Sequence, residues 1–214
     1  VTKDGKDGFL MIGYDDIYSI EYMYEKRMGY WKHDGKVTIF EAFEKLRDNY
    51  QSIMERCRAL DELIYNDAEK AGGKKYAEIC SAAYRQVISA HKLFTDKEGN
   101  LMWFSKENNS NGCINTVDLT YPSAPLFLVY NPDLQKAMMT SIFEYSASGR
   151  WDKPFAAHDL GTYPIANGQV YGGDMPIEES GNMVILTAAI SKIEGNADYA
   201  KKYWDILTTW TIIN

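Results

Sequence analysis

Carboxylates are concentrated in and beside two long polar segments of this 214-residue chain, residues 95–121 and 148–178. Two carboxyl groups in one cleft can hold different pKa values, so that one acts as an acid and the other as a base or nucleophile. The alternative is that surface loops are acidic without any chemical role. The candidate catalytic carboxylates are Glu107, Asp118, Asp159, Asp174, Glu178 and Glu179.

Two motifs within this set are the most suggestive. Residues 155–164 hold His158 next to Asp159, with glycine and proline nearby to fix the backbone. Adjacent side chains rarely point at one substrate, so we expect one to face a ligand and the other to anchor the loop. Residues 172–182 place three carboxylates before and within a helix start. Complementation of the helix dipole explains one of them well and three poorly. Aromatic side chains that could stack on a polar ligand are Trp103, Trp151, Tyr163 and Tyr171.

Other chemistries have weaker support. Cys113 is a candidate nucleophile without an evident base, and three widely spaced cysteines exclude a disulfide framework and zinc-finger spacing. We expect no metal and no cofactor, and the Walker phosphate-binding spacing is absent. The net charge of −7 argues against nucleic-acid binding. No apolar run approaches the roughly 20 residues of a membrane-spanning helix.

The elements that must position these groups are mainly helical. Thr38 and Glu41 form a capping-box pattern, and apolar residues then recur every three to four positions to about residue 70, which predicts a long helix with one buried face. Gly72-Gly73 ends it and predicts an antiparallel partner helix over 74–90. The pattern further predicts strands over 9–12 and 101–105, and helices over 15–31, 122–130, 132–147, 179–194 and 197–213.

Antiparallel neighbours reverse direction at every connection, which allows the loops to be assigned to ends. The short connections between consecutive helices then fall at one end of the helical array. The segments 95–121 and 148–178 fall at the other end. Asp15 and Asp16 fall at the end with the short connections, which favours a structural role for them. Long loops that share one end of an array are usually functional. We therefore expect the candidate carboxylates to meet there.

Long stretches of the chain resemble the glutaminase A family. The similarity runs in order through most of the chain, from about residue 9 to residue 214. The motifs that carry it are residues 13–20 (GYDDIYSI), 104–113 (FSKENNSNGC), 116–118 (TVD), 121–128 (YPSAPLFL), 130–132 (YNP), 153–164 (KPFAAHDLGTYP) and 174–183 (DMPIEESGNM).

The resemblance implies an all-α fold, an (α/α)-toroid of six helical hairpins like those of many glycoside hydrolases. The seven predicted helices make up only part of six hairpins, so we expect a lead-in over 1–14 and a partial hairpin domain over 15–214. Family members are secreted, periplasmic or cell-envelope proteins, frequent in Bacteroides-type bacteria and fungi. A β-rich domain commonly precedes the hairpins, and together with the remaining hairpins of the chain it would be an intramolecular partner.

The implied activity is hydrolysis of L-glutamine to L-glutamate and ammonia, with Asn111 or Asn182 orienting the amino-acid head of the substrate. The family supplies no catalytic assignment that can be transferred to these positions. Two alternatives stay open. One is a glycoside hydrolase, suggested by the fold and by 16 tyrosines and 5 tryptophans. The other is a non-catalytic module that binds a ligand or serves as a scaffold.

Overall fold

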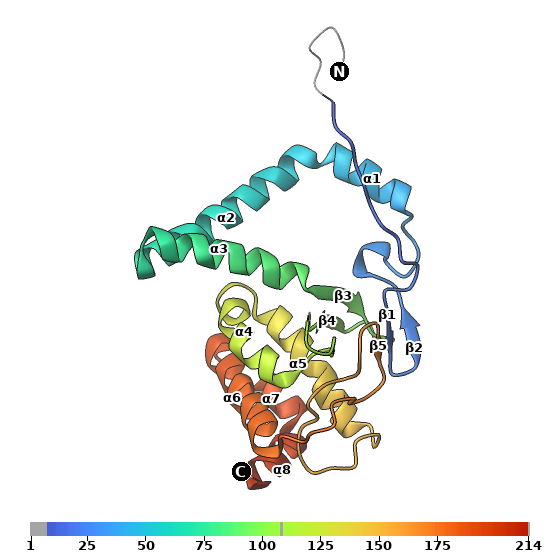
Figure 1. The fold of residues 1–214 in the computed structure, drawn as a ribbon, viewed down its shortest axis with the longest axis vertical. Helices are drawn as coiled ribbons and strands as arrows, with labels where there is room; N and C mark the ends of the chain where they lie inside the picture. The colour runs from blue at the N-terminus through green and yellow to red at the C-terminus, as the bar shows by residue number, and fades with distance from the viewer. Residues whose placement is uncertain (1–7, 108, 214) are drawn as a thin grey trace.

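Helices dominate the computed structural model, which describes residues 8–107 and 109–213 (Figure 1). The predicted predominance of helix is confirmed, but two small sheets accompany the helices, and the complete ring of six hairpins stays a prediction. None of the described helices is long and apolar enough to cross a lipid bilayer. The described helices are α1 (Ile39–Asp48), α2 (Tyr50–Gly72), α3 (Lys74–Ser89), α4 (Val117–Tyr130), α5 (Pro132–Ala147), α6 (Pro176–Glu194), α7 (Asp198–Lys202) and α8 (Trp204–Ile213), with a 3-10 turn at Tyr30–Lys32.

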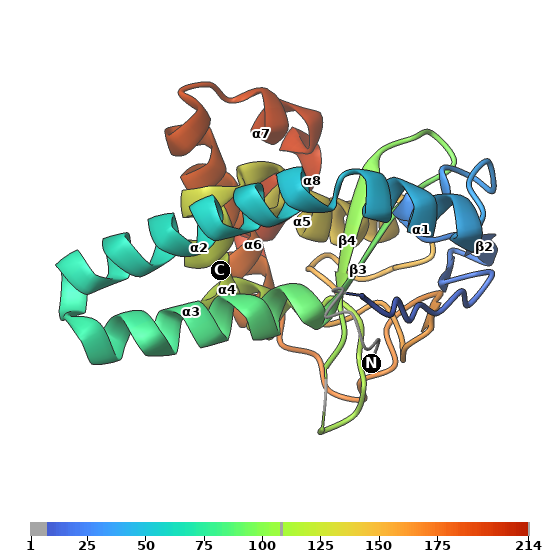
Figure 2. The same ribbon diagram turned by 90° about the horizontal axis from the view of Figure 1, so that it is seen from above.

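Helices α2 and α3 form an antiparallel hairpin whose tip extends beyond the other helices in both views (Figures 1 and 2). Gly73 joins them with a positive φ of 79°, which a side chain would disfavour. The capping box of Thr38 and Glu41 is confirmed at the start of α1. The predicted single helix over 38–70 is wrong in two respects. It breaks at Asn49, and only Ile64 and Ala68 of α2 are buried.

The predicted helix over 15–31 is wrong. This segment forms an antiparallel hairpin of β1 (Ile20–Tyr22) and β2 (Glu25–Arg27). Met23 and Tyr24 make the two-residue turn with φ of 49° and 69°, the left-handed conformation that tight hairpins require. Tyrosine and isoleucine are dense here and favour strands. The predicted strand over 9–12 is also absent from the described residues, and residues 1–7 of the lead-in lie outside them.

The principal core lies between the two sheets and helices α4 to α8. The predicted strand over 101–105 is confirmed as β4 (Leu101–Ser105), which pairs with β3 (His91–Thr95). Helix α5 packs on β4. Its spacing predicts that Leu134, Met138, Ile142 and Tyr145 point inward, and all of these are buried except Leu134, which is half-buried. Helix α4 begins five residues before the predicted Pro122, and the predicted C-terminal helix divides at Tyr203 into α7 and α8.

The two long connections meet, as the parity argument predicts. Cys113 and Thr162 form an antiparallel bridge, and the backbone N–H of Leu160 donates to the carbonyl of Ile114 at 3.0 Å. The predicted position of residues 15–16 at the opposite end is wrong. Strand β1 pairs in parallel with β5 (Ile165–Ala166), so this N-terminal segment joins the long connections instead. The structural role expected for Asp15 is met by an ion pair with Lys32 at 2.7 Å.

Candidate functional site

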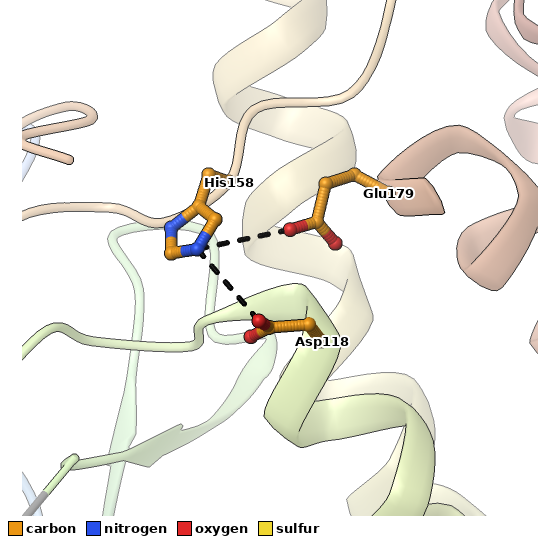
Figure 3. A group of neighbouring side chains, drawn as sticks. All are labelled: Asp118, His158 and Glu179. Atoms are coloured by element: carbon orange, nitrogen blue, oxygen red, sulfur yellow. Dashed lines mark ion pairs between the residues drawn. The ribbon is translucent and has the colours of Figure 1, made fainter. Parts of the chain in front are cut away.

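Four of the predicted site residues converge where the two long connections meet. Nε2 of His158 faces both Asp118 and Glu179, and it is 3.9 Å from Oδ2 of Asp118 and 3.9 Å from Oε1 of Glu179 (Figure 3). On the other side of the ring, Nδ1 of His158 lies 3.0 Å from Oδ2 of Asp159. We call Asp118, His158 and Glu179 the central cluster.

Asp159 anchors the loop, as expected for one member of an adjacent pair. Its side chain is fully buried and accepts backbone N–H bonds from Gly161, Val170 and Tyr171 at 2.8, 3.0 and 3.1 Å. A carboxylate offers only acceptor lone pairs to its neighbours. Nδ1 of His158 must therefore carry the hydrogen, which fixes the tautomer of a neutral ring and leaves Nε2 with a lone pair directed at the cluster.

Two helix N-termini carry the carboxylates of the cluster. Asp118 is in the first turn of α4 and Glu179 in the first turn of α6, and the two helices pack against each other. The backbone N–H of Val117 donates to the carbonyl of His158 at 2.9 Å, which fixes α4 to the histidine loop. Pro176 begins α6, a position that needs no N–H donor. The positive ends of both helices therefore face a site rich in negative charge.

Glu179 has the most perturbed environment in the cluster. It is completely buried, and neither side-chain oxygen has a hydrogen-bond partner among the described residues. Burial, followed by the charges of Asp118, Glu178 and Asp159, raises the pKa of Glu179 to about 9. Functional sites are enriched in such groups, because they are costly to maintain for stability alone.

The cluster reaches solvent at one side. The side chain of Asp118 is 32% exposed, whereas that of His158 is only 4% exposed. Tyr171 stacks on the ring of His158 with centroids 4.2 Å apart and is itself 40% exposed. A small polar molecule could therefore approach past Asp118 and Tyr171.

The other predicted carboxylates lie outside the central cluster. Asp174 is exposed and pairs with Lys153 at 2.5 Å, a contact that lowers the pKa of Asp174. Glu178 is exposed on α6, and Glu107 accepts a hydrogen bond from Thr116 at 3.3 Å. Burial, with the charges of Asp159 and Glu107, raises the pKa of the Cys113 thiol to about 12, so this thiol stays protonated and is a poor nucleophile.

The remaining predicted binding residues are spread around the site. Trp103 lies in a second core cluster and stacks on His91. Trp151 and Tyr163 pack against the principal core, each with a lysine ammonium over its ring. Asn111 accepts the N–H of Cys113 in a local turn, and Asn182 is half-buried on α6.

Sequence reasoning missed Gln169. Its side-chain oxygen accepts the backbone N–H of His158 at 2.7 Å, and its amide nitrogen reaches Asp174 at 3.3 Å. Gln169 thus connects the surface ion pair to the histidine loop. No spacing in the sequence marks this residue, because the contact depends on how residues 148–178 fold back on themselves.

Comparisons with known proteins identify the family of the chain. The "Glutaminase A six helical-hairpin domain" profile matches residues 73–212, which include every residue of the cluster. The chain belongs to the glutaminase A family. A second profile, a domain of unknown function (DUF5127), matches residues 1–67. No solved structure matches the chain.

Two fungal proteins illustrate the relationship within the glutaminase A family. Glutaminase A of Aspergillus oryzae is 38% identical over 177 residues, which are 81% of this chain and 26% of that protein. A probable glutaminase of Arthroderma benhamiae is 35% identical over 160 residues, 72% of this chain and 18% of that protein. The chain therefore spans about a quarter or less of the length of these relatives.

Proposed function

We propose that the central cluster is the hydrolytic site of a glutaminase and cleaves the side-chain amide of L-glutamine to L-glutamate and ammonia. The observation that carries the proposal is the lone pair of His158, which Asp159 fixes and which is directed between the carboxyl groups of Asp118 and the buried Glu179. The names of the two fungal relatives support glutamine as the substrate.

Amide hydrolysis needs an activated water and a proton for the departing ammonia. The water attacks the side-chain carbonyl, the carbon–nitrogen bond breaks, and the proton lost by the water leaves on the nitrogen. Three Lewis-basic groups around one point can activate a water either by accepting its proton or by holding a cation that polarises it. Burial of Glu179 strengthens either effect, because charges interact more strongly away from bulk water.

The test is ammonia release from glutamine by the full-length protein. We expect His158→Gln to lower kcat/KM at least a hundredfold, because the glutamine side chain cannot reproduce the fixed lone pair. The matched control is His33→Asn, since His33 is exposed and lies on a separate turn near the N-terminus. Equal turnover by wild type and His158→Gln would contradict the proposal.

A second candidate function is retaining glycoside hydrolysis. The ligand atoms of Asp118 and Glu179 lie within 4.8 Å of each other, close to the roughly 5–5.5 Å that separates the carboxyl groups of retaining glycosidases. Release of reducing sugar from glycans without release of ammonia from glutamine would favour it. Tight glutamine binding without turnover would favour a non-catalytic binding module instead.

We also propose a location outside the cytoplasm, which rests on the family resemblance alone. Fractionation of cells that express the full-length protein tests it, and recovery with cytosolic markers would contradict it.

A further inference from the structure

The centre of the candidate site is a point faced by one ring nitrogen and by the oxygens of two carboxyl groups. Nδ1 of His158 donates to Asp159, and in this tautomer Nε2 carries a lone pair and no hydrogen. Facing it are carboxylate oxygens of Asp118 and Glu179, each at 3.9 Å. We propose that a divalent cation of the zinc type binds among Asp118, His158 and Glu179, which act as its three protein ligands.

The distances suit a cation. The three candidate ligand atoms lie within 4.8 Å of one another, so a point equidistant from them is about 2.5 Å or less from each. Zinc binds imidazole nitrogen at about 2.0–2.1 Å and carboxylate oxygen at about 2.0–2.2 Å. Shifts of a few tenths of an ångström, which the partly exposed Asp118 side chain can supply, would complete the coordination.

A proton alone does not satisfy the cluster. Hydrogen bonds between nitrogen and oxygen span about 2.7–3.2 Å, so at 3.9 Å a proton on His158 or Glu179 bridges neither pair. Both oxygens of Glu179 and Oδ1 of Asp118 are buried with no hydrogen-bond partner among the described residues. A single cation would satisfy all three side chains at once.

The surroundings of His158 are those of a metal ligand. A histidine that binds a metal through one ring nitrogen almost always donates its other N–H to a carboxylate, a carbonyl or water. Asp159 fills this role at 3.0 Å and is itself held by three backbone N–H groups. The orientation of the ring is therefore set before any cation arrives, which lowers the ordering cost of binding.

The donor set indicates which cation binds. One imidazole and two carboxylates suit Zn²⁺, whereas Mg²⁺ and Ca²⁺ prefer oxygen donors alone. Three protein ligands leave a coordination position for water or substrate, as in catalytic zinc sites. Such a cation polarises an amide carbonyl and lowers the pKa of a bound water. The inference deepens the proposed function, on whose site it rests, and it replaces our sequence-based expectation of a site without metal.

The experiment measures metal binding directly. The full-length protein is stripped with a chelator, dialysed and titrated with Zn²⁺ alone, and bound zinc is measured by elemental analysis. We expect one ion per chain for wild type and its loss in Asp118→Asn and in Glu179→Gln. Asp159→Asn should bind zinc 10- to 100-fold more weakly, because Asp159 only orients the ligand His158. Glu194→Gln, the same change at the other end of α6, should bind normally.

Visible absorption after substitution with Co²⁺ gives a second readout that does not depend on turnover. Failure of wild type to bind either ion, or unchanged zinc binding by both Asp118→Asn and Glu179→Gln, would overturn the cation site. Zinc binding without glutamine turnover would leave the cation site in place and remove the proposed substrate. Glutamine turnover by wild type that binds neither ion would remove the cation site and leave the proposed function.

Discussion

Replacement of Asp159 by asparagine tests both the anchoring of the histidine loop and the tautomer of His158. The side chain is fully buried and receives four hydrogen bonds, two on each oxygen. An asparagine keeps one oxygen and presents donors in place of the other. If it keeps the bonds from Gly161 and Val170, it loses those from His158 and Tyr171.

The expected cost follows from these two bonds. A hydrogen bond to a charged group contributes roughly 1.5–3 kcal/mol, so the loss of two should destabilise the protein by about 3–6 kcal/mol. Native domains have only about 5–15 kcal/mol of stability, which makes this a large fraction. The asparagine amide also faces Nδ1 of His158 with a donor, which drives the ring to the wrong tautomer and should reduce glutamine turnover by several orders of magnitude.

Urea denaturation followed by tryptophan fluorescence measures the change in the free energy of unfolding. The control is Asp198→Asn, because Asp198 is highly exposed and pairs only with Lys201 on the surface. A loss below about 1 kcal/mol for Asp159→Asn, similar to the control, would refute the reasoning that Asp159 holds the loop.

Three further changes test other parts of the fold. Burial lowers the pKa of His91 to about 4. This histidine therefore binds a proton at higher pH in the unfolded chain than in the folded protein, and the free energy of unfolding falls as pH drops from about 6.5 towards 4. The loss is roughly 3 kcal/mol in the free energy of unfolding, and His91→Asn should remove this part of the pH dependence. Asn115→Ala should cost at least about 3 kcal/mol in urea denaturation, because the buried amide makes four hydrogen bonds at a φ of 49°. Thr38→Ala should cost about 1 kcal/mol by removing the capping box with Glu41, and unchanged stability would argue against a stable α1.

Periodicity and capping signals predict the regular helices well. The α5 boundaries follow from Asn131-Pro132 before the helix and from the regular spacing of Met138, Ile142 and Tyr145. The hairpin at residues 20–27 could not be predicted in this way. Its turn residues are Met23 and Tyr24, and neither is the asparagine or glycine that usually occupies a left-handed turn position.

The sequence predicts the candidate residues of the site, but it does not predict which of them come together in space. His158 and Asp159 follow from their motif, including the division into one facing and one anchoring residue. Glu178, Glu179 and Asp174 are equivalent in sequence, because all are carboxylates near one helix start. Only the packing of α6 against α4 buries Glu179 and leaves the other two exposed.

The parallel pairing of β1 with β5 has a consequence for how this protein can be divided or recombined. Backbone N–H groups of Glu21 and Met23 donate to the carbonyls of Pro164 and Ala166, and Asn167 binds the Glu21 side chain at 2.6 Å. The two family matches meet between residues 67 and 73. Strand β1 of the first matched region nevertheless pairs with β5, which lies in the same long connection as His158. A chimera or expression fragment cut at that junction would separate the histidine loop from its own scaffold. The pairing of β1 with β5 therefore joins the two matched regions into one structural unit.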